Sequence, residues 1–172
     1  MMHRTNNTRA TLTRSIVARF ATCTAVAVTA NALQQCTDPE ASGPPILHVG
    51  EDVCADCGMS IVESKYAAAV LYEYEGVREH AVFDDVGCMK LWERDLEETR
   101  IIDRWSGTTD RDQWIDVREG FFVVGSSVRT PMDFHILCCS TREAAEQIIA
   151  TSGGAVTPFD SVEPVLPTTL GR

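Results

Sequence analysis

The pattern of apolar and polar positions predicts that the folded part of the chain begins near Ile46 with a β-hairpin. Residues 66–74 (YAAAVLYEY) and 77–83 (VREHAVF) are rich in apolar, aromatic and β-branched side chains. Glu75-Gly76 separates these two runs, and a short connection containing glycine favours a tight turn. The pattern therefore indicates two antiparallel strands.

A helix and a third strand are predicted after this hairpin. Asp84-Asp85 offers an N-cap for a helix that runs to about Glu98, because aspartate accepts hydrogen bonds from the first free amides of a helix. Residues 101–105 (IIDRW) then indicate a short strand. The order over residues 46–105 is thus β-β-α-β. One face of the helix carries apolar side chains at helical spacing: Cys88, Leu91, Trp92 and Leu96.

A second region with a similar order of elements follows the polar stretch 106–112 (SGTTDRD). Ser140-Thr141-Arg142-Glu143 reads as a capping box that opens a helix, and Gly153-Gly154 ends it. The helix places Ala144, Ala145, Ile148 and Ile149 on its core face. Four segments read as strands or extended chain in this region: Trp114–Val117, Gly120–Val124, Phe134–Cys139 and Ala155–Phe159.

We therefore predict an α+β fold of two tandem β-β-α-β units. The first unit covers residues 46–105 and the second covers 106–159. The tail over residues 160–172 contains two prolines and is predicted to be mobile.

The first 35 residues have the layout of a secretory signal. They contain four arginines and no acidic residue, and the segment from Ile16 to Leu33 is moderately apolar. Two processing sites remain open: Ala30-Asn31-Ala32 has the small-x-small form, whereas Leu33-Gln34-Gln35-Cys36 resembles a lipoprotein box that would lipidate Cys36. Residues 36–45 are polar and rich in proline, which predicts a flexible tether. The chain is therefore expected to be exported, to the periplasm or cell surface, with a lipid anchor left open.

Composition excludes nucleic acid as a partner. Without the first 35 residues, eleven basic residues stand against 25 acidic ones, which is a formal charge of −14. Such a surface repels both nucleic acid and anionic lipid.

The candidate chemistry lies in residues 54–59 (CADCGM). Cys54, Cys57 and Met59 offer two thiols and a thioether, and soft donors select Cu(I), Zn(II) or iron–sulfur over Mg(II) or Ca(II). In an extended segment Cys57 and Met59 leave the same face, and Gly58 lets the backbone curl between them. One thiolate and one thioether suit Cu(I). The alternative is that Met59 fills the core and the two cysteines form a disulfide.

Other cysteine, methionine and histidine side chains are weaker candidates for metal ligands than residues 54–59. Met132 follows Pro131 in a predicted loop and is the candidate third ligand, whereas Cys88 is expected to pack in the core. Adjacent Cys138 and Cys139 point to opposite faces of a strand, so they do not serve one site. His80 and His135 are each expected to be structural or surface histidines.

Two rival functions start from the same cysteines. Cys54-x-x-Cys57 with Asp56 or Asp85 would suit a thiol-dependent enzyme acting on an organometal or a disulfide, although no helix is predicted to start at Cys54 to stabilise its thiolate. A zinc-stabilised structural module is the second rival, but no second cysteine or histidine pair completes a zinc cluster.

Several short motifs together resemble the NosL family of copper-binding accessory proteins. The motifs are Cys54-x-x-Cys57-Gly58-Met59-x-Ile61, Tyr66-Ala67-Ala68, Phe83-Asp84-Asp85-x-Gly87-Cys88-Met89, Trp114-x-Asp116-Val117 and Pro131-Met132. The resemblance spans residue 54 to about residue 159.

This resemblance implies an exported, often lipid-anchored Cu(I) chaperone and not an enzyme. The family's Cys-x-Met copper motif falls on Cys57 and Met59. The implied role, in denitrification, is delivery of copper for the catalytic copper centre of nitrous oxide reductase. The implied partners are that reductase and its assembly ABC transporter complex. The implied fold, two β-β-α-β units, is related to organomercurial lyase.

Overall fold

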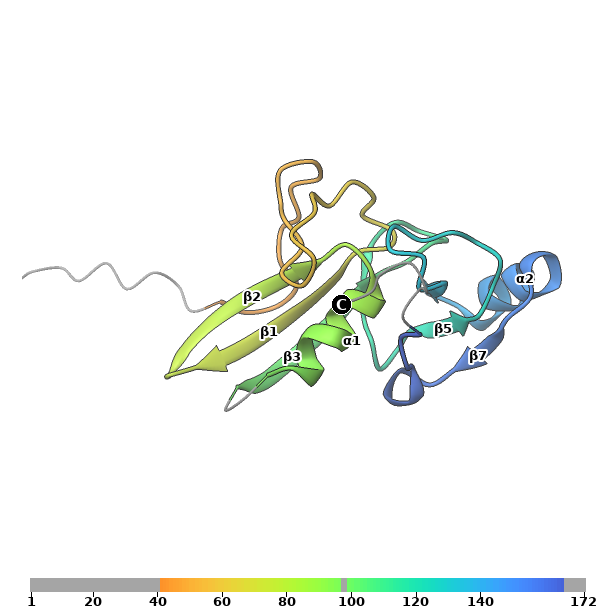
Figure 1. Cartoon of the computed structure of the whole chain (residues 1–172). Coiled ribbons are helices and arrows are strands. Elements are labelled where there is room, and N and C mark those ends of the chain that lie inside the picture. The colour runs from red at the N-terminus through yellow and green to blue at the C-terminus, as the bar shows by residue number, and fades with distance from the viewer. Residues whose placement is uncertain (1–40, 97–98, 166–172) are drawn as a thin grey trace, which may run out of the picture. The chain divides into compact units, whose positions relative to one another are not determined.

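The computed structural model describes residues 41–96 and 99–165 (Figure 1). The predicted signal segment 1–35 and the proposed lipidation site Cys36 lie outside these described residues. Within the described ranges, no helix is long and apolar enough to cross a membrane. The mixed α+β class is confirmed, because two antiparallel sheets are accompanied by two α-helices.

The first sheet contains four antiparallel strands in the order β2-β1-β3-β4. The predicted hairpin is confirmed: β1 (Ala68–Tyr74) pairs with β2 (Val77–Phe83) in a register that joins Tyr74 to Val77 across the turn. Helix α1 (Val86–Arg94) follows, and β3 (Arg100–Gly107) pairs with the other side of β1. β4 (Trp114–Asp116) completes the sheet beside β3.

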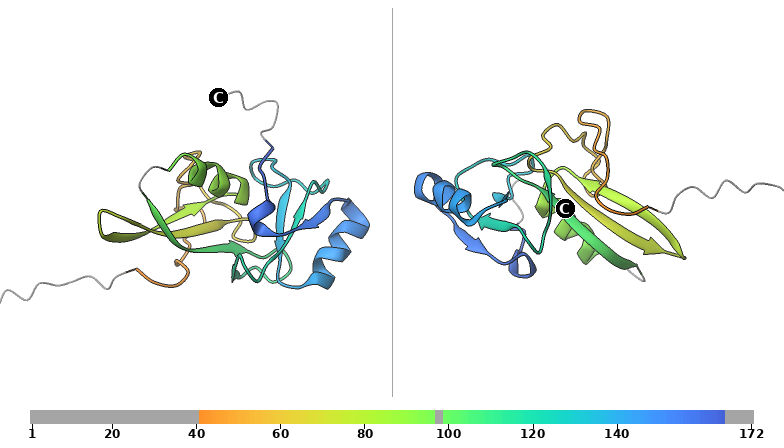
Figure 2. Two further views of the ribbon diagram at one scale, coloured as in Figure 1. Left: turned by 90° about the horizontal axis from the view of Figure 1, so that it is seen from below. Right: turned by 180° about the vertical axis from the view of Figure 1, so that it is seen from behind.

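The second sheet has three antiparallel strands in the order β6-β5-β7. It consists of β5 (Phe121–Val124), β6 (Ile136–Cys139) and β7 (Ala155–Thr157), with helix α2 (Arg142–Ser152) between β6 and β7. A short 3-10 helix, η1 (Phe159–Ser161), follows β7. Figure 2 shows α2 beside this sheet and α1 beside the first.

The prediction that Trp114–Val117 belongs to the second unit is wrong. β4 forms backbone pairs with β3, Trp105 opposite Asp116 and Gly107 opposite Trp114. The polar stretch before β4 is therefore a turn within the first sheet, closed by hydrogen bonds between Thr108 and Gln113. The chain passes to the second sheet only after Asp116.

Helix α1 begins as predicted and ends earlier. Asp85 is the N-cap, and its carboxylate accepts a hydrogen bond from the amide of Gly87 at 2.9 Å. The helix ends at Arg94, so Leu96 lies beyond it, contrary to the prediction of a helix to Glu98. The C-cap residue Asp95 places an acidic group at the negative end of the helix dipole, which disfavours a longer helix.

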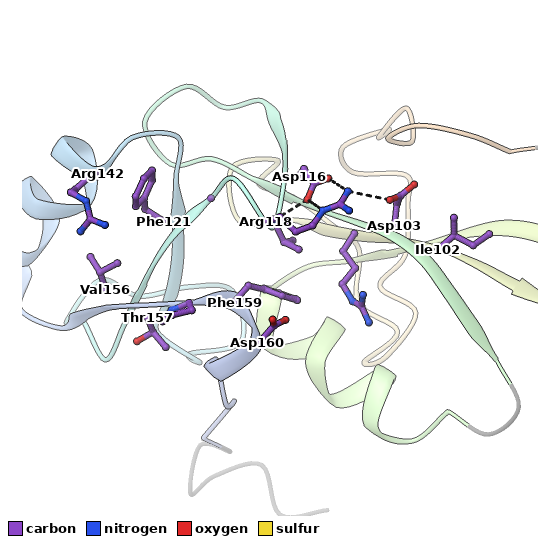
Figure 3. Close-up of a pocket in the computed structure, with 14 residues that line it drawn as sticks. Ile102, Asp103, Asp116, Arg118, Phe121, Arg142, Val156, Thr157, Phe159 and Asp160 are labelled. Atoms are coloured by element: carbon purple, nitrogen blue, oxygen red, sulfur yellow. Dashed lines mark hydrogen bonds and ion pairs between the residues drawn. The ribbon is translucent and has the colours of Figure 1, made fainter.

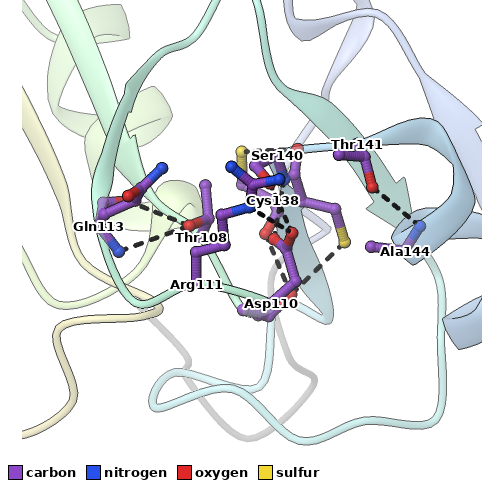
Figure 4. Close-up of polar contacts among 10 residues, drawn as sticks. Thr108, Asp110, Arg111, Gln113, Cys138, Ser140, Thr141 and Ala144 are labelled. Carbon is purple, nitrogen blue, oxygen red and sulfur yellow. Dashed lines mark hydrogen bonds and ion pairs between the residues drawn. The ribbon is translucent and has the colours of Figure 1, made fainter.

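Helix α2 is capped by Thr141, and the predicted capping box from Ser140 to Glu143 is wrong. The Thr141 hydroxyl accepts from the Ala144 amide at 3.2 Å, while Ser140 donates both its amide and its hydroxyl to Asp110 (Figure 4). Ser140 is thus used to fix the turn before β4 against the start of α2. The predicted end at Gly153 is confirmed, with a positive φ of 72°.

One large apolar cluster, here called the main core, takes side chains from both sheets. Val70 and Phe83 of the first sheet and Phe122 and Ile136 of the second all belong to it. Cys138 lies in the main core and Cys139 in a separate cluster under α2, so their predicted opposite orientation is confirmed.

Val162 is also completely buried in the main core. The start of the predicted mobile tail, residues 160–162, is therefore packed.

We expect Gly87→Ala to destabilise the metal-free protein by about 2 kcal/mol, in the range seen when a packed core receives an extra carbon. A Cβ at this position would lie 2.2 Å from the ring of Phe134, which is itself buried. Denaturant unfolding of the single variant and of Gly87→Ala combined with Phe134→Ala tests this. The smaller residue should make the combined cost less than the sum. Strict additivity would contradict the proposed clash.

Candidate metal centre

The cysteine segment is a closed turn and not an extended stretch. Val53 and Ser60 form an isolated antiparallel bridge, and the Cys54 amide donates to the carbonyl of Met59 at 2.8 Å. The Gly58 amide donates back to the carbonyl of Cys54 at 3.0 Å, with a φ of 76° at Gly58. The prediction of an extended Cys57–Met59 pair is therefore wrong, whereas the curl expected at Gly58 is present.

Three thiols meet at this turn. The Sγ atoms of Cys54, Cys57 and Cys88 all lie within 4.8 Å of one another, and all three are free thiols. Cys88 comes from the first turn of α1, which starts where β2 ends. Cys54 and Cys88 are buried, and Cys57 is half-buried. Only a few ångströms of adjustment are needed for all three to bind one soft metal ion.

The placement of Cys88 differs from the sequence prediction. Its burial in the main core agrees with the expected apolar face of α1, but its thiol also belongs to the cysteine cluster. The sequence contained a usable signal, because Cys88 follows the Asp84-Asp85 cap and the N-terminal turn of a helix favours anionic thiolates.

The surroundings of the Cys54 sulfur stabilise its thiolate form. Hydrogen bonding from the Cys88 thiol and from the backbone amides of Cys57, Asp84 and Asp56 outweighs the effect of burial and lowers the pKa of Cys54 to about 5. The same interaction raises the pKa of Cys88, because its proton is held between the two sulfurs. Burial raises the pKa of Cys57. The cluster thus presents one thiolate at neutral pH, and metal binding would displace protons from the other two thiols.

Two buried carboxylates flank the cluster and differ in role. Asp84 has an oxygen without a hydrogen-bond partner, and burial together with the nearby Cys54 charge raises its pKa to about 6. Asp85 accepts from the amides of Gly87 and Met132, the latter at 3.4 Å. Asp85 therefore ties the loop of Met132 to the helix start that carries Cys88.

Met59 is available at the surface. Its side chain is 46% exposed, which excludes the alternative that it fills the core. Met132 is half-buried against the main core, on the loop tied to Asp85. Its role as third ligand remains a prediction.

The remaining sequence candidates are occupied elsewhere. Nε2 of His80 lies 2.8 Å from the carbonyl oxygen of Gly43, and Nδ1 of His135 lies 2.8 Å from that of Val128. Among the described residues, no histidine joins the three thiols. Thr109 contacts the Cys139 sulfur at 3.4 Å, and burial raises the pKa of Cys138 to about 12, so that thiol stays protonated.

A cavity of about 690 Å³ lies elsewhere, lined by β3, β4, β5 and β7 residues and containing none of the cysteine cluster (Figure 3). Arg118 in its wall pairs with Asp116 and Asp103. Arg142 lies over the ring of Phe121 at 5.1 Å. The cavity therefore has balanced charges and contributes no soft donor to the metal site.

We expect oxidation of the metal-free protein to join Cys54 to one of its neighbours and to abolish Cu(I) loading, because a disulfide sulfur is no longer a thiolate ligand. Mass spectrometry with and without reductant should show the loss of two hydrogen atoms per chain. Cys138→Ser is the matched control and should behave like the unmodified chain. Full copper loading of the oxidised protein would contradict this prediction.

The comparisons with known proteins give one family match and two similar solved structures. A family model described as NosL matches residues 45–166, which include the three thiols, Met59 and Met132. The crystal structure of the copper chaperone NosL from Shewanella denitrificans has 22% sequence identity and a TM-score of 0.55, and the match covers 70% of this chain and 98% of that one. The solution NMR structure of the apo-NosL protein from Achromobacter cycloclastes has 22% identity and a TM-score of 0.42, covering 60% and 94%. The comparison with curated proteins gives no match.

Proposed function

This chain belongs to the NosL family, and on that premise we propose that it is an extracytoplasmic Cu(I) chaperone for the catalytic copper centre of nitrous oxide reductase. NosL proteins are copper chaperones and not enzymes, so the thiol-dependent enzyme is set aside. The observation that carries the proposal is the group of three thiols within 4.8 Å of one another, beside the exposed Met59.

The donors of the cluster suit Cu(I) in particular. Cu(I) is a soft ion, and thiolate and thioether sulfur are soft ligands. Cys54 would supply a preformed thiolate, Cys57 a second sulfur near the surface, and Cys88 a third from inside. Met59, together with Met132 if its loop reaches the site, would give a thioether on the solvent side. A site that is buried on one side and accessible on the other holds the ion and still permits its transfer.

The proposed partners are nitrous oxide reductase and its assembly ABC transporter complex. The formal charge of −14 beyond residue 35 favours a partner with a basic face and makes the association sensitive to salt. We further propose export to the periplasm or cell surface, with Cys36 as the lipid-anchor site. Intact mass of the native product decides the anchor, since a soluble protein starting at Leu33 would exclude lipidation of Cys36.

We also propose that the fold consists of two related β-β-α-β units, a fold shared with organomercurial lyase. Support comes from the strand orders: β2-β1-β3 and β6-β5-β7 both place the first strand of the unit between the second and the third. In both units the helix precedes the third strand. β4 is then an addition to the first unit.

The second candidate is a zinc site, favoured by the finding of a third cysteine. Three cysteines with one further ligand make a common structural zinc site. It requires a fourth donor, and among the described residues no histidine nitrogen or carboxylate oxygen belongs to the 4.8 Å group of the three thiols.

Metal titration under anaerobic, reducing conditions tests the proposal. We expect about one Cu(I) per chain in competition with a chromophoric Cu(I) chelator, and a metal-free protein that stays folded. A metal-free chain that unfolds and is restored by Zn(II) would favour the zinc module instead. Failure to bind Cu(I) with all thiols reduced would overturn the chaperone assignment.

A further inference from the structure

Exposed apolar side chains are concentrated around the metal turn. Five of the eight large hydrophobic residues exposed in the described part of the chain lie between residues 46 and 62. Isolated exposed apolar residues are ordinary, but a group around a functional site indicates an interaction surface. The five residues are Ile46, Val49, Val53, Met59 and Val62.

The backbone of the bridge presents Val53 and Val62 on its outer side. In the short antiparallel bridge, Cys54 and Ile61 point inward and are almost fully buried. Their neighbours alternate outward, with Val53 52% exposed and Val62 59% exposed. Met59 is 46% exposed in the same turn, two residues after Cys57. We call the exposed side chains of Val49, Val53, Met59 and Val62 the loop face. The segment that carries them, residues 46–62, is drawn as loops in Figure 1.

Carboxylates accompany the loop face. Residues 46–65 contain four acidic side chains, Glu51, Asp52, Asp56 and Glu63, and one basic residue, Lys65. Lys65 forms an ion pair with Glu63 at 2.9 Å. The segment therefore carries an excess of negative charge around an apolar surface. A second copy of this chain would bring like charges together, whereas a partner with lysine and arginine would be attracted.

We propose that the loop face is the docking surface for the protein that receives the copper, and that this partner presents an apolar centre surrounded by basic residues. The inference rests on the proposed function and specifies the partner of that site. Apolar contact would exclude water around Met59 and Cys57 and bring a sulfur donor of the partner to the ion. Copper would remain Cu(I) throughout: one bond to a sulfur of this chain breaks as one bond to a sulfur of the partner forms.

The test compares two kinds of copper acceptor. Cu(I)-loaded protein is mixed either with purified apo-nitrous oxide reductase and its assembly transporter complex, or with a small chromophoric chelator that needs no docking. Val53→Ser with Val62→Ser should slow transfer to the protein acceptor about tenfold, the scale of losing contacts at the centre of an interface. Transfer to the chelator should not change. Val77→Ser with Tyr74→Ser is the matched control, since both side chains are about half exposed but lie at the far end of the first hairpin.

A second experiment tests whether the acidic residues around the loop face contribute to docking. Glu51→Lys should slow transfer to the protein acceptor several-fold and weaken its dependence on salt, because rim charges act mainly on the rate of association. Glu146→Lys, an exposed position on α2, is the control and should leave the rate unchanged.

The outcomes separate this inference from the proposed function. Equal transfer rates for the unmodified chain and the Val53/Val62 variant would overturn the docking surface while leaving the chaperone role intact. A chain that loads Cu(I) but never transfers it to the reductase machinery would overturn the proposed function, and this inference with it. Self-association of the unmodified chain that the same variant abolishes would show that the loop face binds a second copy.

Discussion

Replacing Cys57 by serine should weaken Cu(I) binding by on the order of a hundredfold or more, since even changes outside the ligand shell cost 10–100-fold at metal sites. Cys57 is the half-buried thiol of the cluster. Serine keeps the size of the side chain but replaces a soft donor by a hard one. Met59→Leu is expected to act in the same direction, because it removes the exposed thioether. Competition against a chromophoric Cu(I) chelator under anaerobic conditions measures both.

Cys88→Ser extends this prediction to the thiol that the structure adds. We expect a loss comparable to that of Cys57→Ser, because the Cys88 sulfur lies within the same 4.8 Å group. Cys138→Ser is the control: this thiol is equally buried but lies in β6, outside the cluster. Retention of copper by Cys57→Ser would refute the site. If the Cys88→Ser variant retained copper while the Cys57→Ser variant lost it, the site would consist of Cys54, Cys57 and the methionines without Cys88.

Loss of the whole protein should leave the electron-entry copper site of nitrous oxide reductase largely filled and its catalytic copper–sulfide cluster deficient. On the proposed function, a single group of thiols would deliver ions one at a time, and another component would supply the sulfide. The measurement is nitrous oxide reduction and enzyme copper content in a deletion strain under copper limitation.

Complementation makes the deletion experiment specific. The unmodified gene should restore activity, the Cys57→Ser gene should not, and the Cys138→Ser gene should. A fully metallated and active reductase in the deletion strain would show that this chain does not serve that enzyme.

The sequence predicted the local structure well where one physical signal dominated. The β1–β2 hairpin is correct because two runs rich in apolar, aromatic and β-branched residues flank a short connection with glycine. The start of α1 at Asp85 and the end of α2 at Gly153 follow from capping chemistry. Errors arose where tertiary contacts decided the outcome, as with Ser140, which bonds to Asp110 across the fold and leaves the cap to Thr141.

The site was predicted in part for the same reason. Cys54, Cys57 and Met59 are neighbours in sequence, so their proximity needed no knowledge of the fold. Cys88 is more than thirty residues away, and its apolar helical face made core packing the simpler expectation. The sequence pattern cannot show that this face turns its first cysteine toward the turn of Cys54, because the position of α1 depends on how the loop and helix pack together.

The main core, which joins both sheets, bears on how the protein can be divided or degraded. A fragment ending near residue 106 would lack Phe122 and Ile136, which belong to the same main core as Phe83 and Val70, and would lack β4 as well. We therefore expect neither half to fold on its own despite the repeated order of strands. Thermal denaturation should be a single cooperative transition, and limited proteolysis should yield no stable half. If the two units arose by duplication, their apolar residues now share the single main core.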